Sequence, residues 1–391
     1  MSLPPSPPDA GVRPDDAEAH EPTAHHGPAR RGWMLLISLV ATAALVGVAF
    51  LLPVPFVKLA PGPTFDVIGD DDGVPVIQIT DTETFPVSGT LDMTTVLESG
   101  GPRGGLTFLD AIASWIDPSD AIVPQELLFP DDITGDEVRQ RQAILFSTSE
   151  SNAIAAAMGH LGLPVTTRVV VEAVYSDTPA FGQLEASDEI IAVDGAAVES
   201  PSDVVDAVRS VPAGTSLEFT VKRAPADEAQ DGDPAAEPLE QTVTVVSEDN
   251  PESPGTPYIG ISVSTLYGAD FPIDFTLEDV GGPSAGLIFA TGIVDKLTPG
   301  GLTAGRHVAG TGTITPEGQV GPIGGIRQKL AGAREAGASL FVMPAVHCGE
   351  ALGHIPDGLT VAPVETLDEA ISAIEAFTAG GAVPSCPVDA T

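Results

Sequence analysis

Ser284 lies in a glycine-rich segment that is suited to chemistry at a hydroxyl group. The string GGPSAG at 281–286 runs directly into an apolar stretch, 287–297, that predicts a helix. A serine at the start of a helix has free main-chain N–H groups beside it and lies near the positive end of the helix dipole. Such groups stabilise an oxyanion, and the small residues after the serine let a carbonyl group approach. The ordinary alternative is that Ser284 only caps this helix.

A nucleophilic serine needs a base, and the chain offers few. It has four lysines and seven histidines. Lys329 lies in an apolar, glycine-rich stretch that predicts a second helix. Burial there would lower the pKa of Lys329, so that its neutral amine takes up the serine proton. The alternatives are a surface lysine on an amphipathic helix, or an α/β-hydrolase that uses one of the downstream histidines, which are His307, His347 and His354.

Two strings carry the serine and the lysine, 45 residues apart. GPSAG at 282–286 is followed by TGTITPEGQVGPIGGIRQKL at 311–330, and this order and spacing resemble the proteolytic domain of Lon proteases. The resemblance implies a serine endopeptidase in which Ser284 is the nucleophile and Lys329 is the general base. It implies that Thr311 hydrogen-bonds the lysine amine, and it gives supporting roles to Gly282, Pro283 and Ala285. The sequence departs from the family at Gly281, where many Lon proteases have aspartate.

Residues 163–250 have the pattern of a small β-rich module. The string SDEIIAVDG at 187–195 is followed by Ser200, Pro201 and Asp203, which together predict the start of a helix. The module resembles PDZ domains of the type found in bacterial proteases. That resemblance implies an edge strand to which an extended peptide adds beside a helix. An acidic stretch at 224–238 is expected to be a solvated loop.

The N-terminal stretch predicts a membrane anchor. Residues 1–31 are proline-rich and polar and are expected to form a disordered cytoplasmic tail. The uncharged run 32–57 has a 20-residue apolar centre, long enough to span a bilayer as a helix. Arg30 and Arg31 precede this run, which places 58–391 outside the cytoplasm, at the cell membrane, by the positive-inside rule. A cleaved signal peptide is the alternative.

The remaining stretches predict an α+β chain with several parts. Residues 255–378 form the Lon-like region, and 379–391 form a C-terminal tail. Residues 58–162 contain a strand at 87–96 and a helix at 149–161, similar to elements that precede the serine in Lon proteolytic domains. The PDZ-like module would then be inserted into a discontinuous protease domain. An independent domain at 58–162 is the alternative.

Composition excludes some classes of function and leaves one question open. The net charge of −39, from 16 basic and 55 acidic residues, excludes a nucleic-acid-binding protein. No G-x-x-x-x-G-K-[ST] string occurs, so no ATPase activity is expected from this chain. No cofactor and no metal site are expected, because no metal-ligand spacing is visible. Cys348 and Cys386 form a disulfide or remain as two free thiols.

The sequence therefore predicts a membrane-anchored Lon-like serine endopeptidase with a PDZ domain. It is expected to cleave unfolded or flexible polypeptide segments outside the cytoplasm without ATP. The PDZ-like module implies a peptide ligand, and the Lon resemblance implies a homo-oligomer, typically a hexamer. The main alternative is a catalytically latent PDZ-containing membrane protein that binds partners. A trypsin-like protease with a PDZ domain is excluded, because the serine follows the PDZ-like module.

Overall fold

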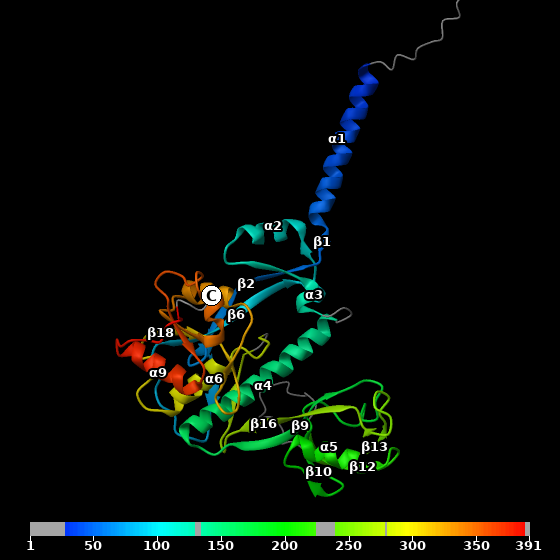
Figure 1. Ribbon diagram of the computed structural model, residues 1–391, viewed down its shortest axis with the longest axis vertical. Coiled ribbons are helices and arrows are strands. Elements are labelled where there is room, and N and C mark those ends of the chain that lie inside the picture. Colours follow the sequence, from blue (N-terminus) through cyan, green and yellow to red (C-terminus); the bar gives the residue numbers. More distant parts are fainter. Residues whose placement is uncertain (1–27, 130–133, 224–238, 278–279, 388–391) are drawn as a thin grey trace, which may run out of the picture. The chain divides into compact units, whose positions relative to one another are not determined.

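The computed structural model describes residues 28–129, 134–223, 239–277 and 280–387 (Figure 1). The chain divides into two units between Leu52 and Pro53. The acidic stretch 224–238 lies outside the described residues, as do 1–27 of the predicted tail. Helix α1 already begins at Pro28, inside that predicted tail. The helices are α1 (Pro28–Leu51), α2 (Phe108–Ile116), α3 (Gln125–Leu128), α4 (Gly135–Leu161), α5 (Pro201–Arg209), α6 (Gly286–Leu297), α7 (Ile326–Ala336), α8 (Cys348–Ala351) and α9 (Leu367–Thr378).

The prediction of a membrane-spanning helix over 32–57 is wrong. Among the helices of the described residues, none is both long enough and apolar enough to cross a membrane. Helix α1 ends at Leu51, and the end of the predicted span forms strands instead. Strand β1 (Pro53–Val54) pairs with β7 (Leu106–Thr107), and Val57 is buried in the next strand. The single-pass topology and the cellular placement of 1–31 and 58–391 depended on that helix, so they are not supported either.

A six-stranded mixed sheet forms the frame around the candidate site. Its order is β22 (Thr360–Val364), β21 (Leu340–Pro344), β18 (His307–Gly310), β6 (Thr90–Gly100), β2 (Phe56–Asp66) and β8 (Ala121–Pro124). The first four strands are parallel to one another, and β2 and β8 run antiparallel to their neighbours. Strands from the first and the last thirds of the chain thus share one sheet.

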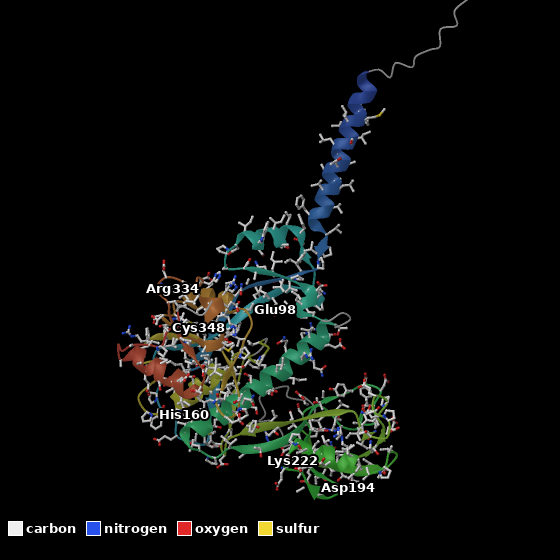
Figure 2. The ribbon with its side chains drawn as sticks, in the orientation of Figure 1. Glu98, His160, Asp194, Lys222, Arg334 and Cys348 are labelled. Carbon is white, nitrogen blue, oxygen red and sulfur yellow. A yellow bond between two sulfur atoms is a disulfide. The ribbon has the colours of Figure 1, made fainter. Side chains whose placement is uncertain are left out.

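Helix α6 is the centre of the largest core. Every residue from Gly286 to Asp295 is buried. A helix that is apolar on all sides needs cover on all sides, and α6 contacts α4, α9 and strand β6. The C-terminal end of α4, where Figure 2 labels His160, is tied to α9. His160 hydrogen-bonds Asp368 at 2.6 Å. The segment that carries Ser284 therefore enters a helix that the rest of the core holds in place.

The PDZ-like module is an antiparallel sheet with its own core. The strand order is β13 (Leu239–Val246), β12 (Ser216–Arg223), β10 (Glu189–Val193), β9 (Thr166–Val174) and β16 (Ile261–Gly268), with β11 (Ala196–Ala197) beside β10. Asp203 caps helix α5 by accepting a hydrogen bond from the N–H of Ser200 at 2.7 Å. Strand β16 lies at one edge of this sheet and beyond the expected boundary at 250, because its residues pair with β9.

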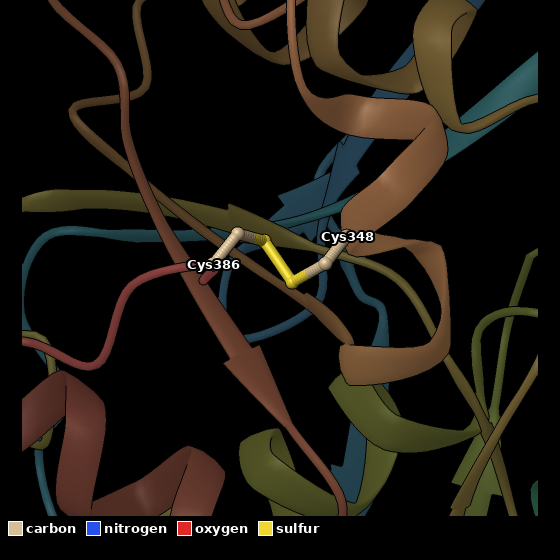
Figure 3. The surroundings of a disulfide bond; sticks show 2 residues. All are labelled: Cys348 and Cys386. Atoms are coloured by element: carbon tan, nitrogen blue, oxygen red, sulfur yellow. A yellow bond between two sulfur atoms is a disulfide. The ribbon is translucent and has the colours of Figure 1, made fainter. Parts of the chain in front are cut away.

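Short hairpins and a disulfide complete the fold. Cys348 in α8 is bonded to Cys386, 38 residues later, which settles the open question in favour of a disulfide (Figure 3). The bond ties the C-terminal segment to the core around α7. Five two-stranded ribbons are described; besides β1 with β7 they are β3 (Asp70–Asp71) with β4 (Val74–Pro75), β5 (Ile77–Ile79) with β17 (Ile273–Phe275), β14 (Glu248–Asp249) with β15 (Pro257–Tyr258), and β19 (Thr313–Ile314) with β20 (Val320–Gly321).

Candidate active site

The side chains of Ser284 and Lys329 meet between two helix N-termini. Ser284 lies two residues before α6, and Lys329 lies in the first turn of α7. The distance from Lys329 Nζ to Ser284 Oγ is 2.7 Å. This is hydrogen-bonding distance, so a proton can pass directly between the hydroxyl and the amine. Two residues 45 positions apart in the sequence therefore form a Ser-Lys pair.

Thr311 fixes the direction of the hydrogen bonds around the lysine. The Thr311 hydroxyl donates to the carbonyl oxygen of Ser284 at 3.0 Å. Its single proton is then committed, so the hydroxyl accepts from Lys329 Nζ, which lies 2.8 Å away. A neutral lysine that donates to Thr311 keeps its lone pair for the Ser284 proton. Thr311 thus fixes the position of the lysine amine beside the Ser284 hydroxyl.

Burial makes Lys329 a base near neutral pH. The residue is 3 % exposed. Burial lowers the pKa of Lys329 from its ordinary 10.5 to about 7, because a charged ammonium loses its hydration there. The neighbouring groups are hydroxyls rather than carboxylates, so they do not restore the charged form. At neutral pH a substantial fraction of this lysine is therefore neutral.

Ser284 does not cap the helix that follows it. Ala285 is the N-cap residue of α6, and no side chain caps that end. Within the described residues, the main-chain N–H groups of Ser284 and Ala285 make no hydrogen bond. The alternative that Ser284 only caps this helix is therefore wrong. Two N–H donors beside its hydroxyl are available for a developing oxyanion.

Helix α4 supports the segment before the serine, a contact that sequence reasoning missed. The carbonyl oxygen of Gln142 accepts from the N–H of Gly282 at 3.1 Å. The Ser149 hydroxyl donates to the carbonyl oxygen of Pro283 at 3.0 Å. A Cβ atom on Gly281 would lie 2.8 Å from the Cβ of Gln142, so an aspartate does not fit at this position without a shift of α4. The departure from the Lon pattern at 281 thus matches the local packing.

A cleft of about 960 Å³ opens beside the Ser-Lys pair. Most side chains that line it are apolar, and Glu98, Arg139 and Lys329 are the charged ones. One wall is strand β6, which pairs with β2 along its length but with β18 only through residues 90–93. At 95–98, the edge of β6 opposite β2 borders the cleft and has no strand partner among the described residues. A strand edge of this kind accepts an extended peptide.

No described histidine is hydrogen-bonded to Ser284. His307 contacts Asp92 at 2.7 Å, and His347 accepts from the N–H of Ile323 at 2.9 Å. None of the hydrogen bonds seen in the described part of the chain joins a histidine to Ser284, whose partner is Lys329. This arrangement does not favour the α/β-hydrolase alternative. The described residues also contain no group of three or more His, Cys, Asp or Glu that could hold a metal ion.

The structure brings the predicted site residues together. Ser284, Lys329 and Thr311 are joined by hydrogen bonds. Gly282 is in the left-handed region with φ of +88°, which allows the turn into the serine. Pro283 and Ala285 flank the serine, and both line the cleft.

Comparison with known proteins identifies two regions. Residues 278–376 match the family model of the Lon protease C-terminal proteolytic domain, and 143–233 match that of the PDZ domain. The chain is similar to Lon proteases from Azorhizobium caulinodans and Brevibacillus choshinensis, with 42% and 39% identity over 94 residues. These alignments cover 23% of this chain and 11–12% of the relatives, so the chain spans about a tenth of their length.

Two solved structures are also similar to the PDZ-like region. They are the PDZ domains of SdrC-like proteins from Listeria monocytogenes, at 26% identity, and Listeria innocua, at 25%. Each alignment covers 25% of this chain, and they cover 86% and 92% of those domains, with a TM-score of 0.19. By the family matches, the chain combines a Lon-type proteolytic region with a PDZ region, and the relatives support a Lon-like serine peptidase.

Proposed function

We propose that the chain is a serine endopeptidase that uses a Ser284–Lys329 dyad and needs no ATP. The observation that supports this most directly is the 2.7 Å contact between Ser284 Oγ and a lysine that is 3 % exposed. A serine hydroxyl is a weak nucleophile unless a base removes its proton. Buried Lys329, with a pKa of about 7, meets that need at neutral pH.

The proposed mechanism proceeds through an acyl-enzyme. Neutral Lys329 takes the Oγ proton as Ser284 attacks the scissile carbonyl carbon. The main-chain N–H groups of Ser284 and Ala285 stabilise the oxyanion. The protonated lysine then gives its proton to the leaving amine, and the peptide C–N bond breaks. A water molecule, deprotonated by the same lysine, attacks the ester and releases the acid product with Ser284 restored.

The proposed substrate is an extended segment of an unfolded or flexible polypeptide. It would add to the edge of β6 at 95–98 and place its scissile carbonyl at Ser284. The apolar lining of the cleft favours apolar side chains near the cleaved bond; it includes Leu59, Phe65, Met93, Leu97, Leu128, Val280 and Ile323. A folded protein cannot supply such a strand without local opening, which makes unfolded chains the preferred class.

The direct test compares the parent chain with its Ser284→Ala variant. Both are incubated with denatured casein and no ATP, and fragments are followed by mass spectrometry. Cleavage by the parent alone supports the proposal, and equal cleavage by both forms contradicts it. Arg327→Ala is a matched control, because it changes another side chain in the first turn of α7 and leaves the dyad intact.

The proposal includes a discontinuous proteolytic domain. Strands β2, β6 and β8 share a sheet with β18, β21 and β22, although the PDZ-like module lies between the two groups in the sequence. We therefore propose that 53–161 and 269–378 form one catalytic domain around the PDZ insert. An assembly of several copies, which the Lon resemblance implies, is measured by light scattering of the purified chain.

A second candidate function is peptide binding without cleavage. Strand β16 is an edge strand of the sheet in the PDZ-like module, and helix α5 contacts this strand. This is the arrangement in which PDZ domains add an extended peptide. A calorimetric titration of the Ser284→Ala variant with a mixture of unstructured peptides measures peptide binding and tests this function separately from cleavage. Binding by this variant together with an inactive parent would favour the adaptor over the protease.

A further inference from the structure

Helix α4 contacts the loop of Ser284 and the strand that follows Thr311. Gln142 and Ser149 are seven residues apart, so they lie two turns apart on one face. Gln142 contacts Gly282 and Ser149 contacts Pro283, the two residues directly before Ser284. One turn further, the Asn152 side-chain amide donates to the carbonyl oxygen of Ile314 at 3.1 Å, next to the loop of Thr311.

The Ser149 contact acts on the peptide unit that carries the nucleophile's N–H group. The Ser149 hydroxyl is bonded to the carbonyl oxygen of Pro283, and Ser149 is 3 % exposed. The peptide bond between Pro283 and Ser284 is planar and trans, so its carbonyl and its N–H point in opposite directions. Fixing the oxygen toward α4 therefore turns the Ser284 N–H away from α4.

That N–H group is a free donor at the site of the reaction. It has no acceptor among the described residues, and Ser284 lines the cleft. A donor is useful to an oxyanion only if its direction is set before the charge develops. Tight packing supports the same direction, since a Cβ atom on Gly286 would lie 2.8 Å from the Ser149 hydroxyl.

We propose that Ser149 is a positioning residue for the oxyanion donor. Its hydroxyl holds the peptide plane between Pro283 and Ser284 so that the Ser284 N–H stabilises the charge on the attacked carbonyl oxygen. Ser149 does not touch the substrate, and it does not contact Lys329. This inference rests on the proposed role of Ser284 as the nucleophile.

Ser151 on the same helix provides a matched control. It is 6 % exposed, and its hydroxyl also bonds to main-chain groups of another element. It accepts from the N–H of Tyr267 at 2.6 Å and donates to the carbonyl oxygen of Tyr267 at 3.4 Å. These contacts are to strand β16 of the PDZ-like module. Ser151→Ala therefore removes a buried hydroxyl from α4 without disturbing 281–284.

The experiment measures kcat and KM of the whole chain with fluorescein-labelled denatured casein. Ser149→Ala is expected to lower kcat by about 10- to 100-fold, less than the loss of an oxyanion donor itself, with KM nearly unchanged. Ser151→Ala is expected to keep kcat within about threefold of the parent. The pH midpoint of kcat is expected to stay near that of the parent in both variants, because the Lys329 contacts are retained. Ser149→Thr, which keeps a hydroxyl, is expected to recover most of the lost turnover.

Two results overturn the inference. One is a folded Ser149→Ala variant with the turnover of the parent, and the other is an equal loss in both alanine variants that follows their melting temperatures. If Ser149→Ala does not fold, Ser149→Cys replaces it, because cysteine fills the space with a weaker donor, and the same criteria apply. Ser284→Ala is measured in parallel. If it remains active, the nucleophile assignment fails, whereas an inactive Ser284→Ala beside a fully active Ser149→Ala refutes the positioning role alone.

Discussion

Lys329 is buried and Lys296 is half-buried, and the side chains around them also differ. Lys329 contacts two hydroxyl groups, and burial alone lowers its pKa to about 7. Lys296 lies in the last turn of α6. Burial also lowers the pKa of Lys296, but the charges of Asp70, Asp66 and Asp295 oppose that shift. Carboxylates favour the ammonium form and hydroxyls do not, so Lys329 combines deeper burial with neighbours that leave its amine neutral.

The largest expected difference between the two regions is in cleavage. Lys329→Met keeps the apolar stem and removes the amine, which should lower kcat/KM by roughly 10⁴-fold or more, because the serine loses its base. Lys296→Met should leave kcat/KM within about threefold of the parent. Initial rates with denatured casein measure both. Substantial cleavage by Lys329→Met would exclude lysine as the base.

The next difference concerns the hydroxyl that orients the lysine. Thr311→Val keeps the shape and removes both the acceptor for Lys329 and the donor to Ser284. We expect a loss of about 10- to 100-fold in kcat, in the range of a misdirected general base. Thr291→Val is the control, because Thr291 is a fully buried threonine of α6 whose hydroxyl bonds to Leu287 and not to the dyad. Equal losses in the two variants would indicate a packing effect.

The site residues were predictable because each lies in a short sequence string that has a recognisable pattern of its own. GPSAG at 282–286 and the string 311–330, which contains Lys329, each have a recognisable pattern, and the apolar run 287–297 predicts the helix after the serine. The contacts of α4 have no local signal. Ser149 meets Pro283 across a separation of 134 residues, and only the packing of α4 against α6 brings them together.

Two other features also depend on contacts between distant residues that the local sequence does not reveal. The apolar run over 32–57 predicted one helix, but sheet pairing recruits its last residues, and hydropathy does not register such pairing. The spacing of Cys348 and Cys386 left two states open. The structure decides between them because the segment after α9 returns to α8. In each case the missing information is a contact between distant parts of the chain.

The pH dependence of cleavage should report Lys329. Since the pKa of Lys329 is about 7, the ammonium form dominates below that pH and the serine loses its base. We expect kcat/KM to rise about tenfold per pH unit below 7 and to level off above it. Lys296 should leave no inflection, so Lys296→Met should have the profile of the parent. A profile that stays flat between pH 5.5 and 8 would contradict the assignment.

Stability should depend on pH with a sign set by the same lysine. The pKa of Lys329 is lower in the folded chain than its ordinary 10.5, so the unfolded chain binds more protons between pH 7 and 10.5. The free energy of unfolding should therefore rise with pH in this window, by up to about 5 kcal/mol. Denaturant unfolding of Ser284→Ala at pH 8 and pH 10 measures part of this rise, and adding Lys329→Met should remove the contribution of Lys329.

Glu150 changes the free energy of unfolding in the opposite direction and over a lower pH range than Lys329 does. Burial raises the pKa of Glu150 to about 7, so its contribution to stability is lost as the pH rises from 4.5 through 7. Measurements above pH 8 therefore exclude Glu150, and the Lys329→Met variant separates Lys329 from Lys296, whose pKa is also lowered.

The smallest expected effect concerns the acids near Lys296. Within the described residues, Asp295 Oδ2 is buried without a hydrogen-bond partner, while Oδ1 accepts from the N–H of Leu302. Burial raises the pKa of Asp295, so its contribution to stability is lost as the pH rises through that folded pKa. Asp295→Asn removes the buried charge and should stabilise the fold at pH 8 by about 1 kcal/mol, with less gain at pH 5. Denaturant unfolding at the two pH values measures this, and cleavage should stay at the parent level. A loss of cleavage would mean that the acids around Lys296 also act on the dyad, and the contrast between the two lysines would then fail.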